Sequence, residues 1–202
     1  MELDKSLFFK IKNIHCEFKT LNDSNVSKEY VDGLNHQTKY IMNIPKNVSI
    51  SSQRKYINNI LLSERDTICG LFIDGKLVGT SGIQSSISFL KYIEVPTEDV
   101  STIGIFIFNK RFRGMGLGKI MVWATAYLFY YCTKKEWFGA GMEKENIRSL
   151  KSFLSCGFVQ VDEDKANYKV LLKLSELIKP EFISEISIHE AGLFIKDINE
   201  TN

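Results

Sequence analysis

The stretch that decides the fold reads Arg111-Phe112-Arg113-Gly114-Met115-Gly116-Leu117-Gly118-Lys119. Before it, residues 102–108 have the β-branched and aromatic content of a buried strand, and after it residues 117–131 are apolar nearly all round, as in a core helix. Alternate glycines let backbone N–H groups turn toward a ligand, and the N-terminal end of a helix carries partial positive charge. The stretch therefore predicts an anion-binding turn, suited to a pyrophosphate, between a strand and a helix.

Two common phosphate-binding motifs do not fit this turn. A dinucleotide-binding fingerprint has the spacing G-x-G-x-x-G and an acidic residue about 20 positions further on, where this chain has Phe138. A Walker loop requires Ser or Thr after Gly-Lys, whereas Gly118-Lys119 is followed by Ile120. A glycine-rich turn that merely joins a strand to a helix remains the alternative.

Length and composition set the outer bounds. The chain has 202 residues, of which 44% are hydrophobic and 25% charged, with a formal net charge of +2. These values favour one globular domain with extra terminal segments, and they do not suggest a nucleic-acid or membrane partner. No secretory signal is visible, and residues 120–132 are too short to span a bilayer. The four cysteines lack metal-site or disulfide spacing. We expect no metal, a cytoplasmic location, and a monomer or homodimer.

The order of elements follows from periodicity and capping signals. One strand is predicted at 7–18, helices at 27–34 and 50–62, and a hairpin of strands 67–73 and 76–88 around Asp74-Gly75. After the 103–108 strand and the 117–131 helix come a strand at 136–142, a helix at 146–155 and a strand at 168–174. In the 146–155 helix we expect Ile147, Leu150 and Leu154 to face inward, with Gly157 as a left-handed C-cap.

Two motifs now point to a family. Arg113-x-x-Gly116-x-Gly118 resembles the pyrophosphate loop of the GNAT superfamily of acyl-CoA-dependent N-acetyltransferases. Asn146-x-x-Ser149-x-x-x-Phe153-x-x-x-Gly157-Phe158 resembles that family's second motif, in which spacings of three and four keep the contact residues on one helix face.

The resemblance implies an α/β (α+β) fold. Its central sheet is mixed and largely antiparallel, is flanked by helices, and contains a splayed parallel strand pair at the cofactor cleft, here residues 102–108 and 136–142. A GNAT-like domain would then occupy residues 1–174. Residues 175–202 would form a C-terminal extension packed on the same domain.

The resemblance also implies acetyl-CoA as cofactor. Pantetheine would contact strand backbone at Phe106, Ile107 and Phe108, and the diphosphate would bind the loop. The loop residues are Arg111, Arg113, Gly114, Met115, Gly116, Leu117, Gly118 and Lys119. Asn146, Ser149 and Phe153 would contact the cofactor from the other side. In a purely structural interpretation, Asn146 only caps its helix and Ser149 only allows close packing.

The implied reaction is direct attack of a primary amine on the thioester. Many GNAT members carry a tyrosine that protonates the leaving thiolate, but this chain has Phe153 there. Because a thiol pKa near 8.5 costs only about 2 kcal/mol at pH 7, the acid is dispensable. Glu94, Glu98 and Asp99 precede the central strand as candidate bases, with Glu98 and Asn146 our catalytic candidates.

The acceptor is indicated only by the N-terminal third. Residues 27–35, followed by Tyr40, are similar to GNAT members that acetylate nucleotide-linked amino sugars for surface glycans, and also to the ribosomal-protein acetyltransferase branch. We expect an amino sugar, because its amine is partly neutral at pH 7. Asn35, His36 and Tyr40 would surround it, and Arg54 would bind its phosphate. The alternatives are a protein N-terminal acetyltransferase and a non-catalytic acyl-CoA-binding module.

Overall fold

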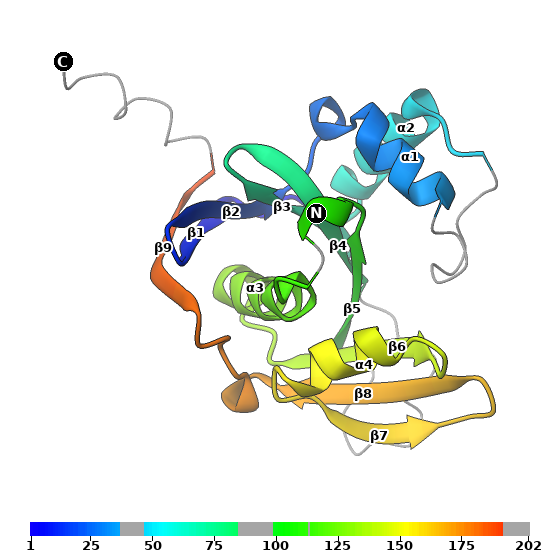
Figure 1. Cartoon of the computed structure of the whole chain (residues 1–202), viewed down its shortest axis with the longest axis vertical. Helices are drawn as coiled ribbons and strands as arrows, with labels where there is room; N and C mark the ends of the chain where they lie inside the picture. The colour runs from blue at the N-terminus through cyan, green and yellow to red at the C-terminus, as the bar shows by residue number, and fades with distance from the viewer. Residues whose placement is uncertain (37–46, 85–98, 113, 192–202) are drawn as a thin grey trace.

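The computed structural model describes residues 1–36, 47–84, 99–112 and 114–191, and its centre is one nine-stranded sheet (Figure 1). The strand order is β7-β8-β6-β5-β4-β3-β2-β1-β9. The strands are β1 Lys5–Ile11, β2 Ile14–Thr20, β3 Thr67–Ile73, β4 Lys76–Gln84, β5 Val100–Ile107, β6 Trp137–Glu143, β7 Val159–Glu163, β8 Asn167–Lys173 and β9 Ile183–Glu190. All neighbours in this sheet are antiparallel except β5 and β6, which run parallel. The predicted fold class is confirmed.

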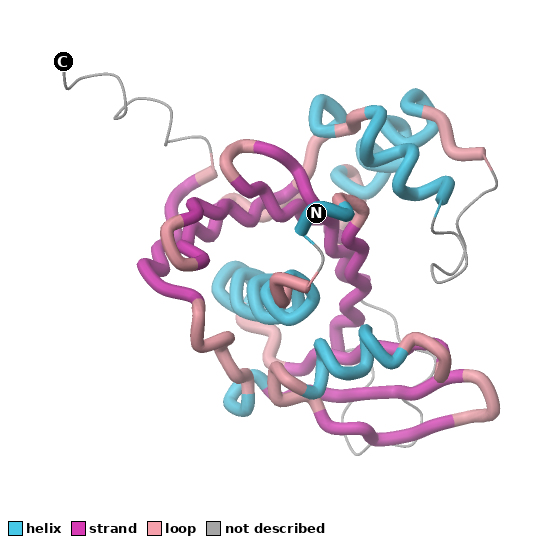
Figure 2. Tube along the Cα trace, viewed as in Figure 1, coloured by secondary structure: helices cyan, strands magenta, loops and turns pink. Residues whose placement is uncertain are grey.

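Helices cover both faces of the sheet (Figure 2). The helices are α1 Lys28–His36, α2 Ile50–Leu61, α3 Leu117–Thr133 and α4 Ile147–Leu154. The larger apolar core forms around α3, and a second core lies between α1, α2 and the opposite face. Within the described ranges, no helix combines the length and the apolar character that crossing a membrane requires.

Local signals were reliable where a single residue type dictates the backbone. Asp74 and Gly75 both have positive φ, 47° and 74°, as a two-residue hairpin turn requires. Ser49 caps α2, accepting a hydrogen bond from the Ser52 N–H, and Gly157 has φ 93° beyond the end of α4. Residues 85–88 of the predicted hairpin lie outside the described residues.

The predicted single strand at 7–18 is wrong. The segment forms two strands, β1 and β2, which pair antiparallel around a turn in which Lys12 has φ 57°. Neither Gly nor Pro marks this turn, because a lysine occupies the left-handed position that usually selects glycine. The alternation of apolar and polar residues continues through the turn and hides it.

The prediction also missed β7 and β9, and the reasons are visible in the structure. β7 is a short edge strand whose residues are exposed or half-buried, so it has no apolar signature. β9 pairs with β1, far away in the sequence, and the register shifts between Phe8 and Lys10. Glu185 in β9 has φ 50°. This irregularity breaks the two-residue period, so the tail carries no readable strand pattern.

The inward face expected for α4 is wrong in part. Ile147 and Leu154 are 42% and 40% exposed, whereas Phe153 is only 2% exposed and packs in the main core. Leu150 is half-buried against that core. In a helix of eight residues the largest side chain sets the buried face more strongly than a three-residue apolar stripe does.

We predict that Gly157→Ala lowers the free energy of unfolding far more than Gly75→Ala. A Cβ at Gly157 would come within 2.0 Å of the Glu176 carbonyl oxygen in addition to occupying positive φ, whereas a Cβ at Gly75 meets nothing within 4 Å. The expected losses are more than about 3 kcal/mol and about 1 kcal/mol respectively. Urea denaturation of both variants measures this, and equal losses would contradict the assigned contact between Gly157 and the segment at Glu176.

Candidate functional site

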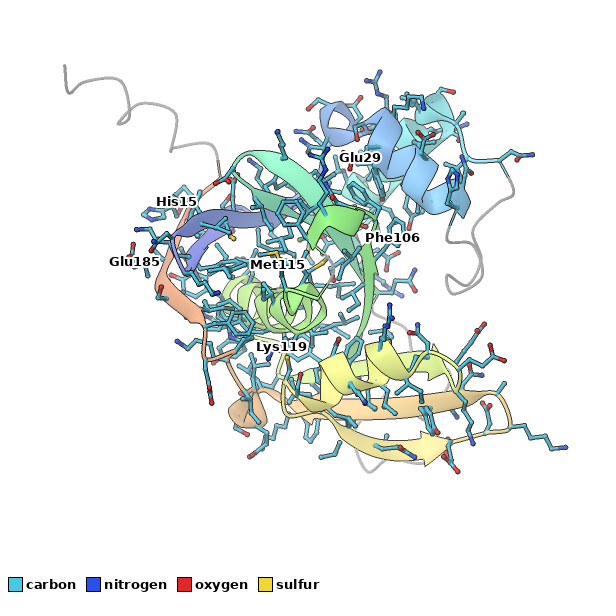
Figure 3. All side chains as sticks on the ribbon, in the orientation of Figure 1. His15, Glu29, Phe106, Met115, Lys119 and Glu185 are labelled. Carbon is cyan, nitrogen blue, oxygen red and sulfur yellow. The ribbon has the colours of Figure 1, made fainter. Side chains whose placement is uncertain are left out.

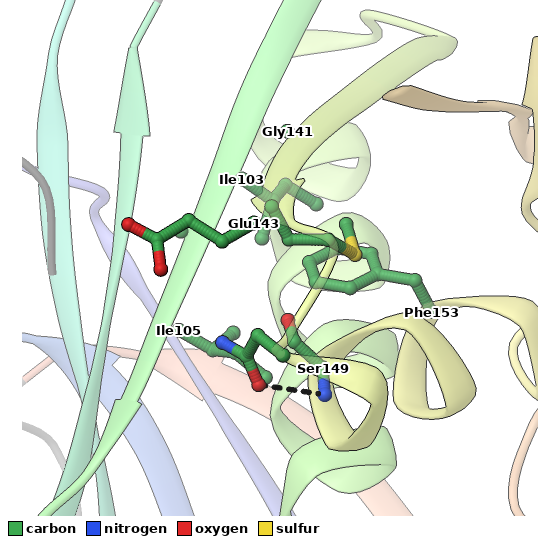
Figure 4. Close-up of a pocket in the computed structure, with 9 residues that line it drawn as sticks. Ile103, Ile105, Gly141, Glu143, Ser149 and Phe153 are labelled. Atoms are coloured by element: carbon green, nitrogen blue, oxygen red, sulfur yellow. Dashed lines mark hydrogen bonds between the residues drawn. The ribbon is translucent and has the colours of Figure 1, made fainter. Parts of the chain in front are cut away.

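The parallel strands β5 and β6 pair only over their first three residues. Val100, Ser101 and Thr102 face Trp137, Phe138 and Gly139, and no further pairs follow although both strands continue. A cavity of about 100 Å³ opens where they part (Figure 4). Its lining residues are Ile103, Gly104, Ile105, Gly141, Met142, Glu143, Asn146, Ser149 and Phe153. The predicted splay is therefore present, and we call this space the cleft.

Each of the two strands is bonded on its outer side, and past residue 102 the inner edges share no residue pair. β5 pairs with β4 from Gly79↔Ile107 to Gln84↔Thr102, and β6 pairs with β8 along its whole length. The Gly104 carbonyl also accepts a hydrogen bond from Ser81 Oγ, 3.1 Å away. At residues 103–105 the inner edge of β5 has no strand partner, so it offers backbone groups to an extended ligand.

Helix α4 forms the wall of the cleft opposite β5. Asn146 is its N-cap, and its Oδ1 accepts a hydrogen bond from the Ser149 N–H at 3.2 Å (Figure 4). Asn146 and Ser149 also line the cleft, so capping and facing the cavity occur together. The Phe153 ring is buried and packs edge-on against Phe158 at a centroid distance of 5.0 Å. The wall therefore has an amide and a hydroxyl but no phenol.

Glu143 is a cleft residue that sequence reasoning missed. Its neighbours Phe138, Ala140 and Met142 are buried in the core around α3, so alternation along β6 turns Glu143 to the opposite face. Figure 4 shows its carboxylate extending across the cleft, away from the Phe153 ring. No ion pair within the described residues involves Glu143. The usable signal was its outward register position three residues before Asn146.

The glycine-rich loop ends in an uncapped helix. Gly114 and Gly116 have φ 84° and 75°, and Gly116 is the N-cap of α3 without a side-chain hydrogen bond. The first bond into the helix is from the Ile120 N–H to the Gly116 carbonyl, at 3.2 Å. Over the described residues, the N–H groups of 117–119 have no acceptor in the loop or beyond it, which leaves them available to an anion.

The remaining residues of the glycine-rich loop differ in exposure and contacts. Arg111 is exposed in the middle of the 3-10 turn Lys110–Phe112, and Met115 is 37% exposed. The Lys119 ammonium lies 4.8 Å from the centre of the Phe182 ring. Figure 3 places Met115 and Lys119 at the same end of α3. Arg113 lies outside the described residues.

Cys156 is structural. Its thiol donates a hydrogen bond to the Lys119 carbonyl at 3.2 Å and so joins the end of α4 to the start of α3. Burial raises the pKa of the Cys156 thiol to about 11. A protonated, buried thiol is no nucleophile at neutral pH.

A second cavity, of about 330 Å³, lies between α1 and the end of β5. Its lining residues are Glu29, Asp32, Gly33, His36, Phe108, Asn109 and Arg111. Phe108 also stacks on the buried Tyr30 at 5.1 Å. The two cavities therefore follow one another along β5, the first at residues 103–105 and the second at residues 108–109.

The residues expected to bind the acceptor do not form one site in the structure. Both ends of the Asn35 side-chain amide are bonded to Val48 backbone, at 2.9 and 2.8 Å, so Asn35 fixes the segment before α2. His36 lines the second cavity, with Nδ1 2.6 Å from the Asp32 carbonyl. Arg54 is exposed on α2 and lines neither cavity. Tyr40, Glu94 and Glu98 lie outside the described residues, and Asp99 is exposed.

Comparison with known proteins supports the fold. No family model and no curated protein sequence matches the chain. Mycobacterium smegmatis RimJ in complex with CoA-disulfide has a TM-score of 0.70 at 13% identity, covering 89% of this chain and 93% of that one. The Vibrio fischeri ribosomal-protein-S5-alanine acetyltransferase gives 0.66 at 13%, covering 86% and 99%.

An aminoglycoside acetyltransferase, AAC(6')-Ib, solved in complex with coenzyme A and kanamycin, gives a TM-score of 0.64 at 15% identity. The alignment covers 80% of this chain and 96% of that one. The architecture is thus the GNAT fold. At these identities the likeness concerns the fold alone.

We predict that Asn146→Ala lowers the free energy of unfolding by about 1 kcal/mol, because α4 loses its N-cap, while Asn146→Asp retains the cap and most of the stability. Urea denaturation measures both. If Asn146→Ala is as stable as the wild type, the bond to the Ser149 N–H contributes nothing and the side chain serves the cleft only.

Proposed function

We propose that the chain is an acetyl-CoA-dependent N-acetyltransferase that acetylates a primary amine. The observation that carries the proposal is that one fold combines two features. The start of α3 is uncapped and follows glycines with positive φ, and a cleft lies between β5 and β6. Proteins with this fold have been solved with coenzyme A bound.

The residues present fit the coenzyme in three places. The N–H groups of 117–119 and the Lys119 ammonium suit a diphosphate by geometry and charge. The unpaired edge of β5 at residues 103–105 suits the amides of a pantetheine arm. From α4, the Asn146 amide nitrogen and the Ser149 hydroxyl remain available for polar contacts.

The chemistry needs few protein groups. When bound, acetyl-CoA supplies an activated thioester carbonyl, to which the amine forms a C–N bond as the C–S bond breaks. Glu143 is placed to accept the proton that the amine loses, directly or through water. Phe153 gives no proton, so the thiolate leaves unassisted, which near neutral pH costs only about 2 kcal/mol.

Among acceptors, a peptide N-terminus is our first candidate. Two carboxylates, Glu29 and Asp32, and one cation, Arg111, line the second cavity, and Asp32 is ion-paired with Lys28 at 2.6 Å. Glu29 is thus the group there that favours a cationic amine. Arg54, which we expected to bind the phosphate of a nucleotide sugar, lines neither cavity. The nucleotide-linked amino sugar stays as the alternative, since its amine is also partly neutral at pH 7.

The experiment that tests the function offers the protein acetyl-CoA with three acceptor groups: N-terminal peptides, aminoglycosides, and nucleotide-linked amino sugars. Release of CoA thiol measures turnover, and mass spectrometry identifies the acetylated product. We expect acetylation of the peptide α-amine. Binding of acetyl-CoA without thiol release for any acceptor would favour a non-catalytic acyl-CoA-binding module.

We predict that Lys119→Met weakens acetyl-CoA binding roughly 10-fold to 100-fold, because one charge-assisted bond to a phosphate is lost. The matched control is Lys134→Met at the opposite end of the same helix, which should leave the affinity unchanged. Isothermal titration calorimetry measures both dissociation constants. Equal affinities for the two variants would remove Lys119 from the coenzyme site.

We predict that Glu143→Gln lowers kcat/KM about 100-fold at pH 7 without changing the acetyl-CoA dissociation constant. The deficit should shrink as pH rises, because more of the acceptor amine is already deprotonated. The control is Glu145→Gln, an exposed carboxylate two residues further on. If both variants keep wild-type activity across the pH range, Glu143 is not the base.

A further inference from the structure

The chain after β8 returns to the start of α3. A 3-10 turn at Leu174–Glu176 follows β8, and β9 then pairs antiparallel with β1 at the edge of the sheet. Phe182 directly precedes β9, whose first residue, Ile183, is 2% exposed in the main core. The Ile183 N–H donates to the Pro180 carbonyl at 3.1 Å, and the Lys179 ammonium donates to the Ile183 carbonyl at 3.0 Å. These bonds fix the position of Phe182.

The Phe182 ring contacts both parts of the glycine-rich loop. The Lys119 ammonium lies 4.8 Å from the ring centroid, within the range of a cation–π interaction. A Cβ built on Gly116 would come within 3.0 Å of Phe182 Cζ, so the ring packs directly against the left-handed N-cap of α3. One side chain from the C-terminal segment thus touches the lysine and the turn that expose the anion-binding groups.

The contact between Lys119 and the Phe182 ring does not neutralise the charge of the ammonium. No carboxylate forms an ion pair with Lys119 in the described part of the chain. A carboxylate partner would neutralise the ammonium and compete with a bound phosphate. An aromatic face attracts the ammonium without accepting its three N–H donors in ordinary hydrogen bonds, so the donors stay available.

We propose that Phe182 is a positioning residue: it holds Lys119 toward the diphosphate of acetyl-CoA, so that the C-terminal segment completes the coenzyme site. This inference rests on the proposed function, because it assigns a role within the same site. It gives residues 175–190 a part in cofactor binding that lies outside the two glycine and asparagine motifs.

The test is a double-mutant cycle on the full chain, measured by isothermal titration calorimetry. Phe182→Leu and Phe182→Met both keep an apolar side chain and remove the aromatic face. In the wild-type background each should weaken acetyl-CoA binding about threefold to tenfold. In the Lys119→Met background neither should weaken binding further. Phe182→Tyr, which keeps the ring, should retain wild-type affinity.

A second ligand separates positioning from a general loss of structure. S-acetylpantetheine has no phosphate groups, so its affinity should not change in the Phe182 variants, and their thermal unfolding is followed in parallel. The inference is overturned if the Phe182 variants bind as tightly as the wild type, or lose the same affinity in the Lys119→Met background or for S-acetylpantetheine. Failure of the wild type itself to bind acetyl-CoA overturns the proposed function, and the inference with it.

Discussion

The structure depends on the parting of β5 from β6 after three residue pairs. Both strands pair with an outer neighbour, β4 or β8, along nearly their whole length, whereas between them they share only three residue pairs. At the point of divergence the hydroxyls of Ser101 and Thr102 are buried without a hydrogen-bond partner among the described residues. Buried polar groups left unpaired cost about 1 to 3 kcal/mol each. Both residues lie in the paired part of β5 and neither lines the cleft, so this cost falls beside the opening rather than within it.

The position of α3 relative to the cleft is fixed by side-chain hydrogen bonds. The Ser81 hydroxyl accepts a hydrogen bond from Thr125 of this helix at 2.8 Å and donates one to the Gly104 carbonyl. This relay connects the middle of α3 to β5 where the strands separate. Because α3 is fixed against the strand, its uncapped first turn is held in a constant position relative to the cleft. A pyrophosphate group and an extended arm on one ligand could then occupy both places together.

How much the sequence could predict follows from the range of each interaction. The Asp74-Gly75 turn, the Ser49 cap and the Gly157 C-cap depend on a few adjacent residues, and all three were predicted. β9 depends on pairing with β1 across most of the chain and contains a left-handed Glu185, so its pattern carries no local signal. For the site, the glycine loop and Asn146 were identifiable from spacing. Glu143 was missed, because its only signal is its alternation with Phe138, Ala140 and Met142 along β6, and the predicted strand ended at residue 142.

Under the proposed N-acetyltransferase activity, the acceptor is restricted by the one carboxylate and the missing phenol among the described residues that line the cleft. Deprotonating an α-amine of pKa near 8 at pH 7 costs about 1.4 kcal/mol, whereas a lysine side chain of pKa near 10.4 costs about 4.6 kcal/mol. A single carboxylate such as Glu143 can supply the smaller of these two deprotonation free energies.

The leaving thiolate adds about 2 kcal/mol that Phe153 cannot relieve, so the total favours acceptors whose amine is nearly neutral. A peptide α-amine meets this condition, and the amine of an amino sugar meets it as well, while a lysine side chain does not. The choice between the first two depends on charge at the second cavity, where Glu29 opposes Arg111 and Asp32 is paired with Lys28; our proposal of a peptide acceptor relies on Glu29.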